Sequence, residues 1–322
     1  MAEASRPARG PQRHSSALQA LERESHGVAD RLPDLLVEAK RISATVTHGV
    51  HGRRRAGPGE TFWQFRQLQV NDSAQLIDWR RSASTDHLYV REREWEAAHT
   101  LWLWCNLSRS MDFRSHLSKV TKRDRAIVLT LASAELLVRS GERVGLLGVT
   151  LPTSSRKAST KLAEAMASPQ FHDLAEESQP PRARLSRFSS AVLFSDFLDP
   201  IDTVRSHIEV LASSGVTGHL IQVLDPAEET LPYEGRTEFL SPDGSQRWLA
   251  DRVETMRARY QEKLAAHRAE LIEIATRLGW TFMVHHTDRP ASEPLLTLIM
   301  RLENRDGGYR GAGKASTLGG AP

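Results

Sequence analysis

The pattern of apolar and polar residues changes near residue 99. From there to residue 224, short apolar runs of strand length alternate with segments in which apolar residues recur every three or four positions, which is typical of helices. Strands that alternate with helices predict a mostly parallel sheet with helices on both faces, joined by right-handed crossovers. We therefore expect an α/β fold. The expected strands are 101–105, 144–149, 191–194 and 219–224, and the expected helices are 122–138, 157–166 and 201–213.

The alternation ends after residue 224. Proline and glycine interrupt the next stretch, which favours a hairpin-like insertion at 225–250. A long helix is predicted at 251–278, because apolar residues there lie on one face at three- and four-residue steps. The last strand and the last helix are expected at 280–285 and 292–301.

The first hundred residues predict a smaller unit. Apolar residues at helical spacing indicate a helix at 28–43. Two strand-like segments, 60–70 and 87–95, indicate a β-hairpin placed before the main sheet. The expected organisation is a disordered arm (1–25), an N-terminal helix and β-hairpin subdomain (26–98), the α/β domain with its insertion (99–302), and a disordered tail (303–322).

Composition narrows the class of protein. The 322 residues are 39% hydrophobic and 26% charged, and 43 basic residues exceed 40 acidic ones by only three, so the charge balance does not favour nucleic-acid binding. No apolar run reaches the length of a membrane span, and the N-terminus has no apolar signal core. We expect a cytoplasmic protein without a membrane segment. The single cysteine, Cys105, lies in an apolar run, and we expect a buried hydrophobic residue and not a reactive thiol.

A polar turn follows the first strand of the predicted sheet. Asn106, Ser108 and Ser110 alternate directly after the apolar run 101–105, and Asp196 follows the strand 191–194. The carboxyl ends of strands in an open α/β sheet are where ligands bind, and oxygen side chains suit Mg²⁺. Asn106 supplies a neutral oxygen, which weakens such a site. The alternative is that these side chains only satisfy backbone groups of a strand-to-helix turn.

Two further groups have both a binding and a structural interpretation. Asp78, Trp79 and Arg80 form either a partner contact or a structural corner in which Trp79 packs. Arg53, Arg54 and Arg55, on a Gly-rich loop, either meet phosphates or an acidic protein surface, or are simply solvated.

Adjacent histidines do not predict a catalytic or metal site. His285 and His286 point to opposite faces of a strand, so they cannot hold one ion together, even with Asp288 nearby. Ser108 and Ser110 have no assigned base. We therefore predict no catalytic residues.

Several short motifs together resemble the domain-of-unknown-function 58 family, which contains a von Willebrand factor type A-like domain. The resemblance covers about residues 42–302. The matching segments are Gly59-Glu60, Phe65-Arg66, Ile77-Asp78-Trp79-Arg80, Ser82-Ala83, Val90-Arg91-Glu92 and Asn106-Leu107-Ser108-Arg109-Ser110-Met111.

The resemblance implies a degenerate metal-ion-dependent adhesion-type site. In the type A fold the first turn reads Asp-x-Ser-x-Ser, and here Asn106 replaces the aspartate while Ser108 and Ser110 match. Asp196 fits the aspartate of the third loop. The threonine of the second loop has no clear match, and Ser178 is the nearest candidate.

The resemblance also implies a partner. Members of this family are commonly linked to MoxR-type AAA+ ATPases, so we expect a non-enzymatic adaptor in protein maturation or metal insertion. Arg109 or the Arg53–Arg55 loop would then meet acidic groups of the partner. The alternatives are an Mg²⁺-dependent hydrolase or phosphatase that uses the same turn and, third, a nucleic-acid binder. The sequence does not name the client protein.

Overall fold

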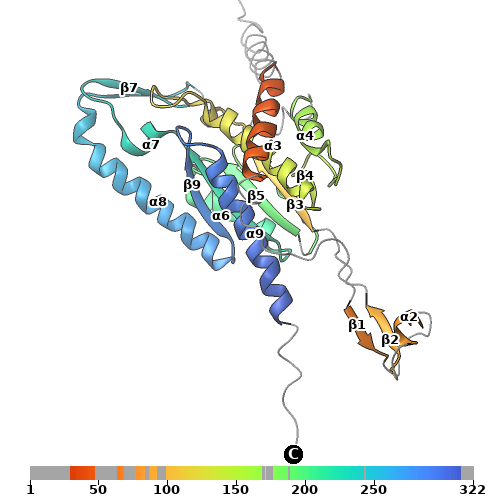
Figure 1. Ribbon diagram of the computed structural model, residues 1–322. Helices are drawn as coiled ribbons and strands as arrows, with labels where there is room; N and C mark the ends of the chain where they lie inside the picture. Colours follow the sequence, from red (N-terminus) through yellow and green to blue (C-terminus); the bar gives the residue numbers. More distant parts are fainter. Residues whose placement is uncertain are drawn as a thin grey trace, which may run out of the picture. The chain divides into compact units, whose positions relative to one another are not determined.

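The central sheet has five strands in the order β4-β3-β5-β6-β9, and every neighbouring pair is parallel (Figure 1). This arrangement confirms the predicted α/β class. In this computed structural model the described residues are 30–47, 64–68, 77, 79–83, 87–92, 99–168, 171, 177–187, 189–242 and 244–312. The strands are β3 Thr100–Cys105, β4 Arg143–Leu146, β5 Ser189–Ser195, β6 Thr217–Leu224 and β9 Thr281–His286.

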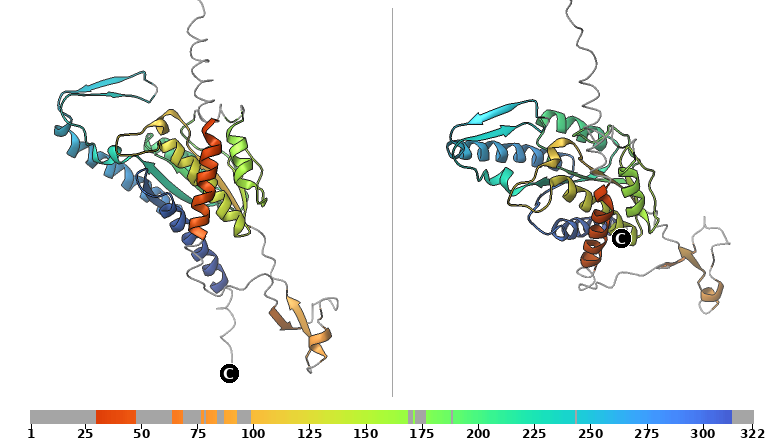
Figure 2. Two further views of the ribbon diagram at one scale, coloured as in Figure 1. Left: turned by 45° about the horizontal axis from the view of Figure 1, so that its top comes forward. Right: turned by 90° about the horizontal axis from the view of Figure 1, so that it is seen from above.

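Helices cover both faces of the sheet (Figures 1 and 2). On one face, α6 and α8 pack with residues such as Leu193, Leu220 and Trp280 into one core cluster. On the other face lies α3, which is buried nearly all round, since 13 of its 18 residues are buried. The bounds are α3 Lys122–Arg139, α4 Ala158–Met166, α6 Ile201–Ala212, α8 Arg257–Arg277 and α9 Ser292–Ala312.

The helix at residues 30–47 belongs to the α/β unit. Its apolar stripe is buried, and Arg31 Nη1 lies 2.7 Å from Asp124 Oδ2 of α3. The chain accordingly divides into one unit that contains residues up to 47 and from 99 onward, and a second unit at 48–98. This boundary differs from the predicted subdomain at 26–98, because the helix buries its stripe in the larger unit. The stripe consists of Leu32, Leu35, Ala39, Ile42 and Val46.

The second unit contains the predicted hairpin. Strands β1 (Gln64–Gln67) and β2 (Tyr89–Glu92) pair antiparallel, and the short helix α2 (Trp79–Ser82) lies between them in the chain. The backbone N–H of Tyr89 donates to Ser82 Oγ at 2.9 Å, which joins β2 to α2.

The predicted insertion is part helix and part hairpin. It begins with α7 (Pro226–Thr230), and the antiparallel pair β7 (Thr237–Leu240) and β8 (Arg247–Ala250) follows. After the 3₁₀ turn η3 (Val253–Thr255), α8 begins at Arg257, six residues later than predicted. The reason is that Val253 belongs to a separate small core with Leu231 and Ala250, and not to the face of the long helix.

The last helix is longer than predicted. We expected it to end at residue 301 and the chain to be disordered from 303, but α9 continues to Ala312.

The backbone of Gly218 in β6 lies close against the indole ring of Trp280, the residue before β9. A Cβ atom added to Gly218 would lie 2.0 Å from two ring carbons of Trp280, whose Nε1 donates to the Val216 carbonyl at 2.9 Å. Gly218→Ala should therefore lower the free energy of unfolding by about 3 kcal/mol, because neither the strand nor the buried ring has room to move. Urea denaturation measures the loss.

Gly235→Ala is the matched control. No atom lies within 4 Å of a Cβ built there, and only its φ of +67° is unfavourable. We expect this variant to lose about 1 kcal/mol. Equal losses for the two variants would contradict the steric account of Gly218.

Candidate functional site

The two polar loops predicted from the sequence meet at the carboxyl edge of the sheet. The chain leaves β3 for β4 on one side and later returns to β5 on the other side, so the ends of β3 and β5 form the topological switch point. Asn106 follows β3, and its backbone N–H donates to the Phe194 carbonyl of β5 at 2.8 Å. Asp196 follows β5 directly. The structure therefore brings Asn106 and Asp196 to neighbouring strand ends.

The amide of Asn106 uses both of its ends within the protein. Its Nδ2 donates to Ser195 Oγ at 3.0 Å, and its Oδ1 accepts from the Ser108 backbone N–H at 2.8 Å. The Ser108 and Ser110 hydroxyls lie 3.2 Å apart and hydrogen-bond each other. These contacts are those of the structural interpretation, in which the side chains satisfy a tight turn.

A buried lysine that sequence reasoning missed completes the site. Lys122 is the first residue of α3, and its side chain is 1% exposed. Its ammonium donates to Asp196 Oδ2 at 2.9 Å and to Glu228 Oε1 of α7 at 2.6 Å. Burial lowers the pKa of Lys122, but the two carboxylates outweigh burial and raise this pKa above its usual value. The site thus contains its own cation.

The carboxylates around the lysine are themselves held by α7. Asp225 caps this helix by accepting from the Ala227 N–H at 2.9 Å, and Glu228 Oε2 accepts from the Asp225 N–H at 2.9 Å, which completes a capping box. Burial raises the pKa of Glu228, against the opposing effects of Lys122 and of that N–H. The capping box fixes the Glu228 carboxylate beside the ammonium.

The residues at this edge do not fit a divalent ion. One carboxylate oxygen of Asp196, Oδ2, lies against the Lys122 ammonium, and the serine hydroxyls are paired with each other. Within the part of the chain that the structure describes, no group of three or more His, Cys, Asp or Glu is placed to hold a metal ion. The predicted residues thus lie at one edge of the sheet, where one of them, Asp196, pairs with a buried lysine.

Residues 109–120, which we call the edge loop, join β3 to α3 through the 3₁₀ turn η2 (Arg109–Asp112). Within this loop, the Met111 side chain is fully buried. Arg123 of α3 donates to the Ser108 carbonyl and pairs with Asp112. Asp225 accepts from the Ser115 backbone N–H at 2.9 Å and from its hydroxyl at 2.5 Å. The loop is thus held near its start and in its middle.

The edge loop presents apolar and basic side chains to solvent. Phe113 is 39% and Leu117 is 41% exposed. The predicted partner-binding residue Arg109 is exposed in the same loop. The other exposed side chains of the loop are Arg114, His116 and Lys119.

The remaining predicted binding residues lie in the second unit. Arg53, Arg54, Arg55 and Asp78 are outside the described residues. Trp79 is 64% exposed and Arg80 is exposed, so the structure does not support the interpretation in which Trp79 packs as a corner.

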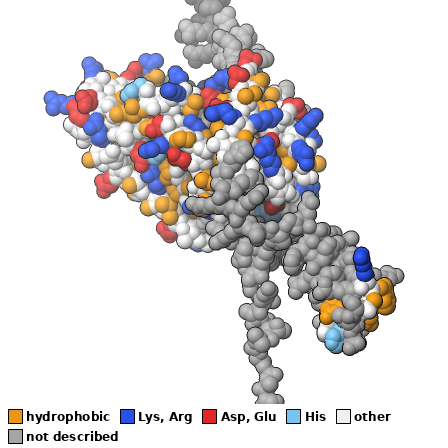
Figure 3. All heavy atoms as spheres, in the orientation of Figure 1, with side chains coloured by type: hydrophobic (Ala, Val, Ile, Leu, Met, Phe, Trp, Pro, Cys, Tyr) orange, Lys and Arg blue, Asp and Glu red, His pale blue; other side chains and the backbone are white. Residues whose placement is uncertain are grey.

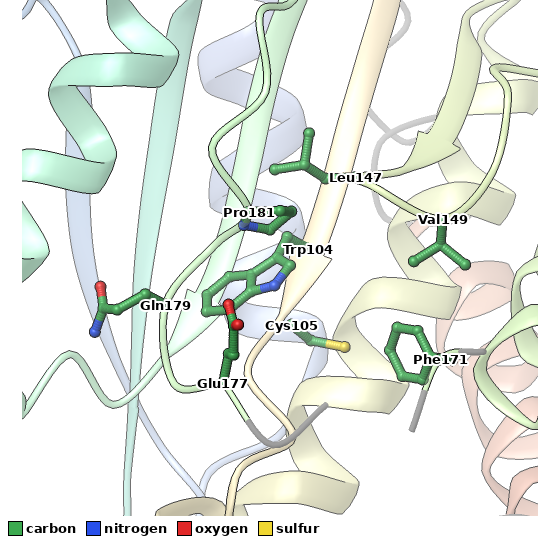
Figure 4. A pocket seen from close by; sticks show the side chains of 8 residues that line it. All are labelled: Trp104, Cys105, Leu147, Val149, Phe171, Glu177, Gln179 and Pro181. Carbon is green, nitrogen blue, oxygen red and sulfur yellow. The ribbon is translucent and has the colours of Figure 1, made fainter. Parts of the chain in front are cut away.

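A small cavity lies at the end of β3, beside Trp104, Cys105, Phe171 and Gln179 (Figure 4). Its volume is about 10 Å³, which is room for roughly one water molecule. Burial raises the pKa of the Cys105 thiol to about 12, so the thiol stays protonated at neutral pH. The structure confirms the prediction that Cys105 is buried.

The two adjacent histidines have different surroundings. His286 Nε2 contacts the Glu229 carboxylate of α7, whereas His285 is buried near Arg125 of α3. Burial, with smaller contributions from the Arg125 and His286 charges, lowers the pKa of His285 to about 3.

Comparison with known proteins places the chain in a family. Residues 64–270 match the family described as "Protein of unknown function DUF58", and the chain belongs to this family. The proteins named "Uncharacterized protein Rv1480" of Mycobacterium tuberculosis (strain ATCC 25618 / H37Rv) and "Uncharacterized protein Mb1516" of Mycobacterium bovis are each 28% identical to it over 275 residues, which is 81% of this chain and 86% of theirs.

Two solved structures are similar at a lower level. One is the conserved hypothetical protein BatB from Bacteroides thetaiotaomicron, with a TM-score of 0.37 and 15% identity over 64% of this chain and 100% of that chain. The other is an aerotolerance-related membrane protein from Bacteroides fragilis, with a TM-score of 0.35 and 17% identity over 63% of this chain and 100% of that chain. In the chain described here, none of the described helices combines the length and the apolar character needed to cross a membrane.

The buried His285 should make stability depend on pH. Its pKa is about 3 in the folded protein, below its ordinary value of 6.5, so between these values the unfolded chain binds more protons. Stability should therefore fall as the pH falls through this window, by up to about 1.4 kcal/mol per pH unit from this residue. Urea denaturation between pH 7 and pH 4 should show a shallower pH dependence for His285→Asn than for the wild type.

The exposed His116 provides the matched control. His116→Asn should keep the wild-type pH dependence. If His285→Asn also kept it, the buried neutral imidazole would not be the cause.

Proposed function

We propose that this protein is a non-enzymatic interaction module that works as an adaptor for a MoxR-type AAA+ ATPase in protein maturation or metal insertion, and that it docks through the carboxyl edge of its sheet. The ATPase and the process follow from the family resemblance. We also propose that it acts in the cytoplasm. The observation that carries the docking surface is the edge loop, which is anchored from beneath and yet exposes apolar and basic side chains.

Rigidity is the first reason why the edge loop suits a partner. Met111, Arg123 and Asp225 hold the loop, so ordering it on binding costs little entropy. Phe113 and Leu117 are each about two-fifths exposed on this fixed backbone. Apolar side chains on a preorganised surface can be buried by a partner without a large ordering cost.

Charge is the second reason, because it selects the kind of partner. The loop carries three cationic side chains, and its single acidic residue, Asp112, is paired with Arg123. Its net positive charge favours an acidic segment with apolar residues. By contrast, basic and acidic side chains are interspersed over the face seen in Figure 3, which does not favour a polyanion such as nucleic acid. The cationic residues are Arg109, Arg114 and Lys119.

The alternative of an Mg²⁺-dependent hydrolase or phosphatase finds less support at the same edge. Such an enzyme needs Asp196 as a ligand, and the Lys122 ammonium holds this carboxylate at 2.9 Å. The Ser108 and Ser110 hydroxyls hydrogen-bond each other, and neither contacts a histidine or carboxylate base in the hydrogen bonds of the described residues.

Binding to the purified MoxR-type ATPase from the same cell tests the proposal. The variant Arg109→Glu/Phe113→Ser/Leu117→Ser should weaken binding at least about tenfold, because it removes two apolar anchors and reverses one charge. Affinity measured by surface plasmon resonance, with ATP and with ADP, gives the change. Higher salt should also weaken wild-type binding.

The control variant changes similar side chains outside the edge loop. Leu151 is 87% exposed and Arg156 is exposed, and both follow β4. Leu151→Ser/Arg156→Glu should bind the ATPase as the wild type does. Wild-type affinity of the edge-loop variant, with its circular dichroism unchanged, would refute docking at this edge.

A further inference from the structure

The position of the Lys122 ammonium supports an inference that does not depend on which partner the edge binds. Lys122 and Asp196 are 1% and 2% exposed in their side chains, and Glu228 is 15% exposed. An ammonium that is removed from water between two carboxylates is a fixed cation. It lies against the aspartate that, in the type A pattern, would help to hold a divalent ion.

The first turn of this edge carries one negative charge fewer than the Asp-x-Ser-x-Ser pattern. In the Asp-x-Ser-x-Ser pattern, a carboxylate in the first turn and a second one in the third loop offset the two charges of a divalent ion. Here Asn106 removes one negative charge, and a single ammonium then offsets the remaining carboxylate of Asp196. Glu228 adds a carboxylate from α7 at the partly exposed rim.

The other potential ligands are also satisfied without a metal. Asn106 Oδ1 accepts from the Ser108 N–H, and the two serine hydroxyls bond each other. Mg²⁺ requires oxygen ligands at about 2.1 Å in octahedral geometry. To bind, it would have to break these hydrogen bonds and lie beside the lysine charge.

We propose that Lys122 is a built-in replacement for the divalent cation of this edge, so that Asp196 is neutralised and joined to α3 and α7 without metal. The ammonium joins α3 to the end of β5 and to α7, as a bound ion would join its ligands.

Metal titration of the wild-type protein is the first test. The melting temperature should be the same, within about 1 °C, in EDTA and in 5 mM MgCl₂ or MnCl₂, since only a ligand that binds the folded state raises it. Electron paramagnetic resonance should show that added Mn²⁺ stays free. Stoichiometric Mn²⁺ binding that is lost in Asp196→Asn would overturn the proposal.

The second test asks whether Lys122 is what excludes the ion. Asn106→Asp/Lys122→Ser restores a carboxylate and removes the ammonium, so this variant should bind Mn²⁺ and melt at a higher temperature when Mn²⁺ is present. Asn106→Asp, which keeps Lys122, is the matched control and should show neither effect. A folded double variant that does not bind Mn²⁺ would contradict the role given to Lys122. If the double variant does not fold even with Mn²⁺ present, the wild-type titration decides the proposal.

Discussion

The Lys122 ammonium joins three elements that are far apart in the sequence. Lys122 is the first residue of α3, and its ammonium pairs with Asp196 after β5 and with Glu228 in α7. Taking a lysine charge out of water costs several kcal/mol, and only close pairing with good geometry offsets this cost. The surrounding structure supplies this geometry, because Asp225 and the capping box hold Glu228 while the end of β5 holds Asp196. Removing the ammonium would leave two carboxylates at this site, Asp196 and Glu228, without their cation.

The fold explains why these groups meet where they do. Strand order β4-β3-β5-β6-β9 puts the ends of β3 and β5 side by side at the switch point, where loops diverge and side chains converge. The edge loop joins this switch point to α3, whose first residue is Lys122. Asp225 accepts two hydrogen bonds from Ser115, so the same short helix that holds Glu228 also holds the loop. The arrangement of the buried charges and the exposed surface of the loop therefore depend on each other.

Much of this arrangement could be predicted from the sequence, and the exceptions have physical reasons. Apolar runs and helical spacing gave the order of strands and helices, and the end of each strand placed Asn106 and Asp196 at one edge. Lys122 was missed because lysine is almost never fully buried, and nothing local marks one that is. Glu228 was missed although a signal was present: Asp225-Pro226-Ala227-Glu228 is an N-cap, a proline at the first helical position and a glutamate at the third. The stretch was read as a hairpin because of its prolines and glycines.

A crystal structure of the wild-type protein grown with MnCl₂ tests the central claim most directly, because manganese is identified by its anomalous scattering. The account predicts no anomalous peak within coordination distance of Asp196, and the Lys122 ammonium within hydrogen-bond distance of both Asp196 and Glu228. A manganese ion bound to Asp196, with Lys122 turned out of the site, would contradict it.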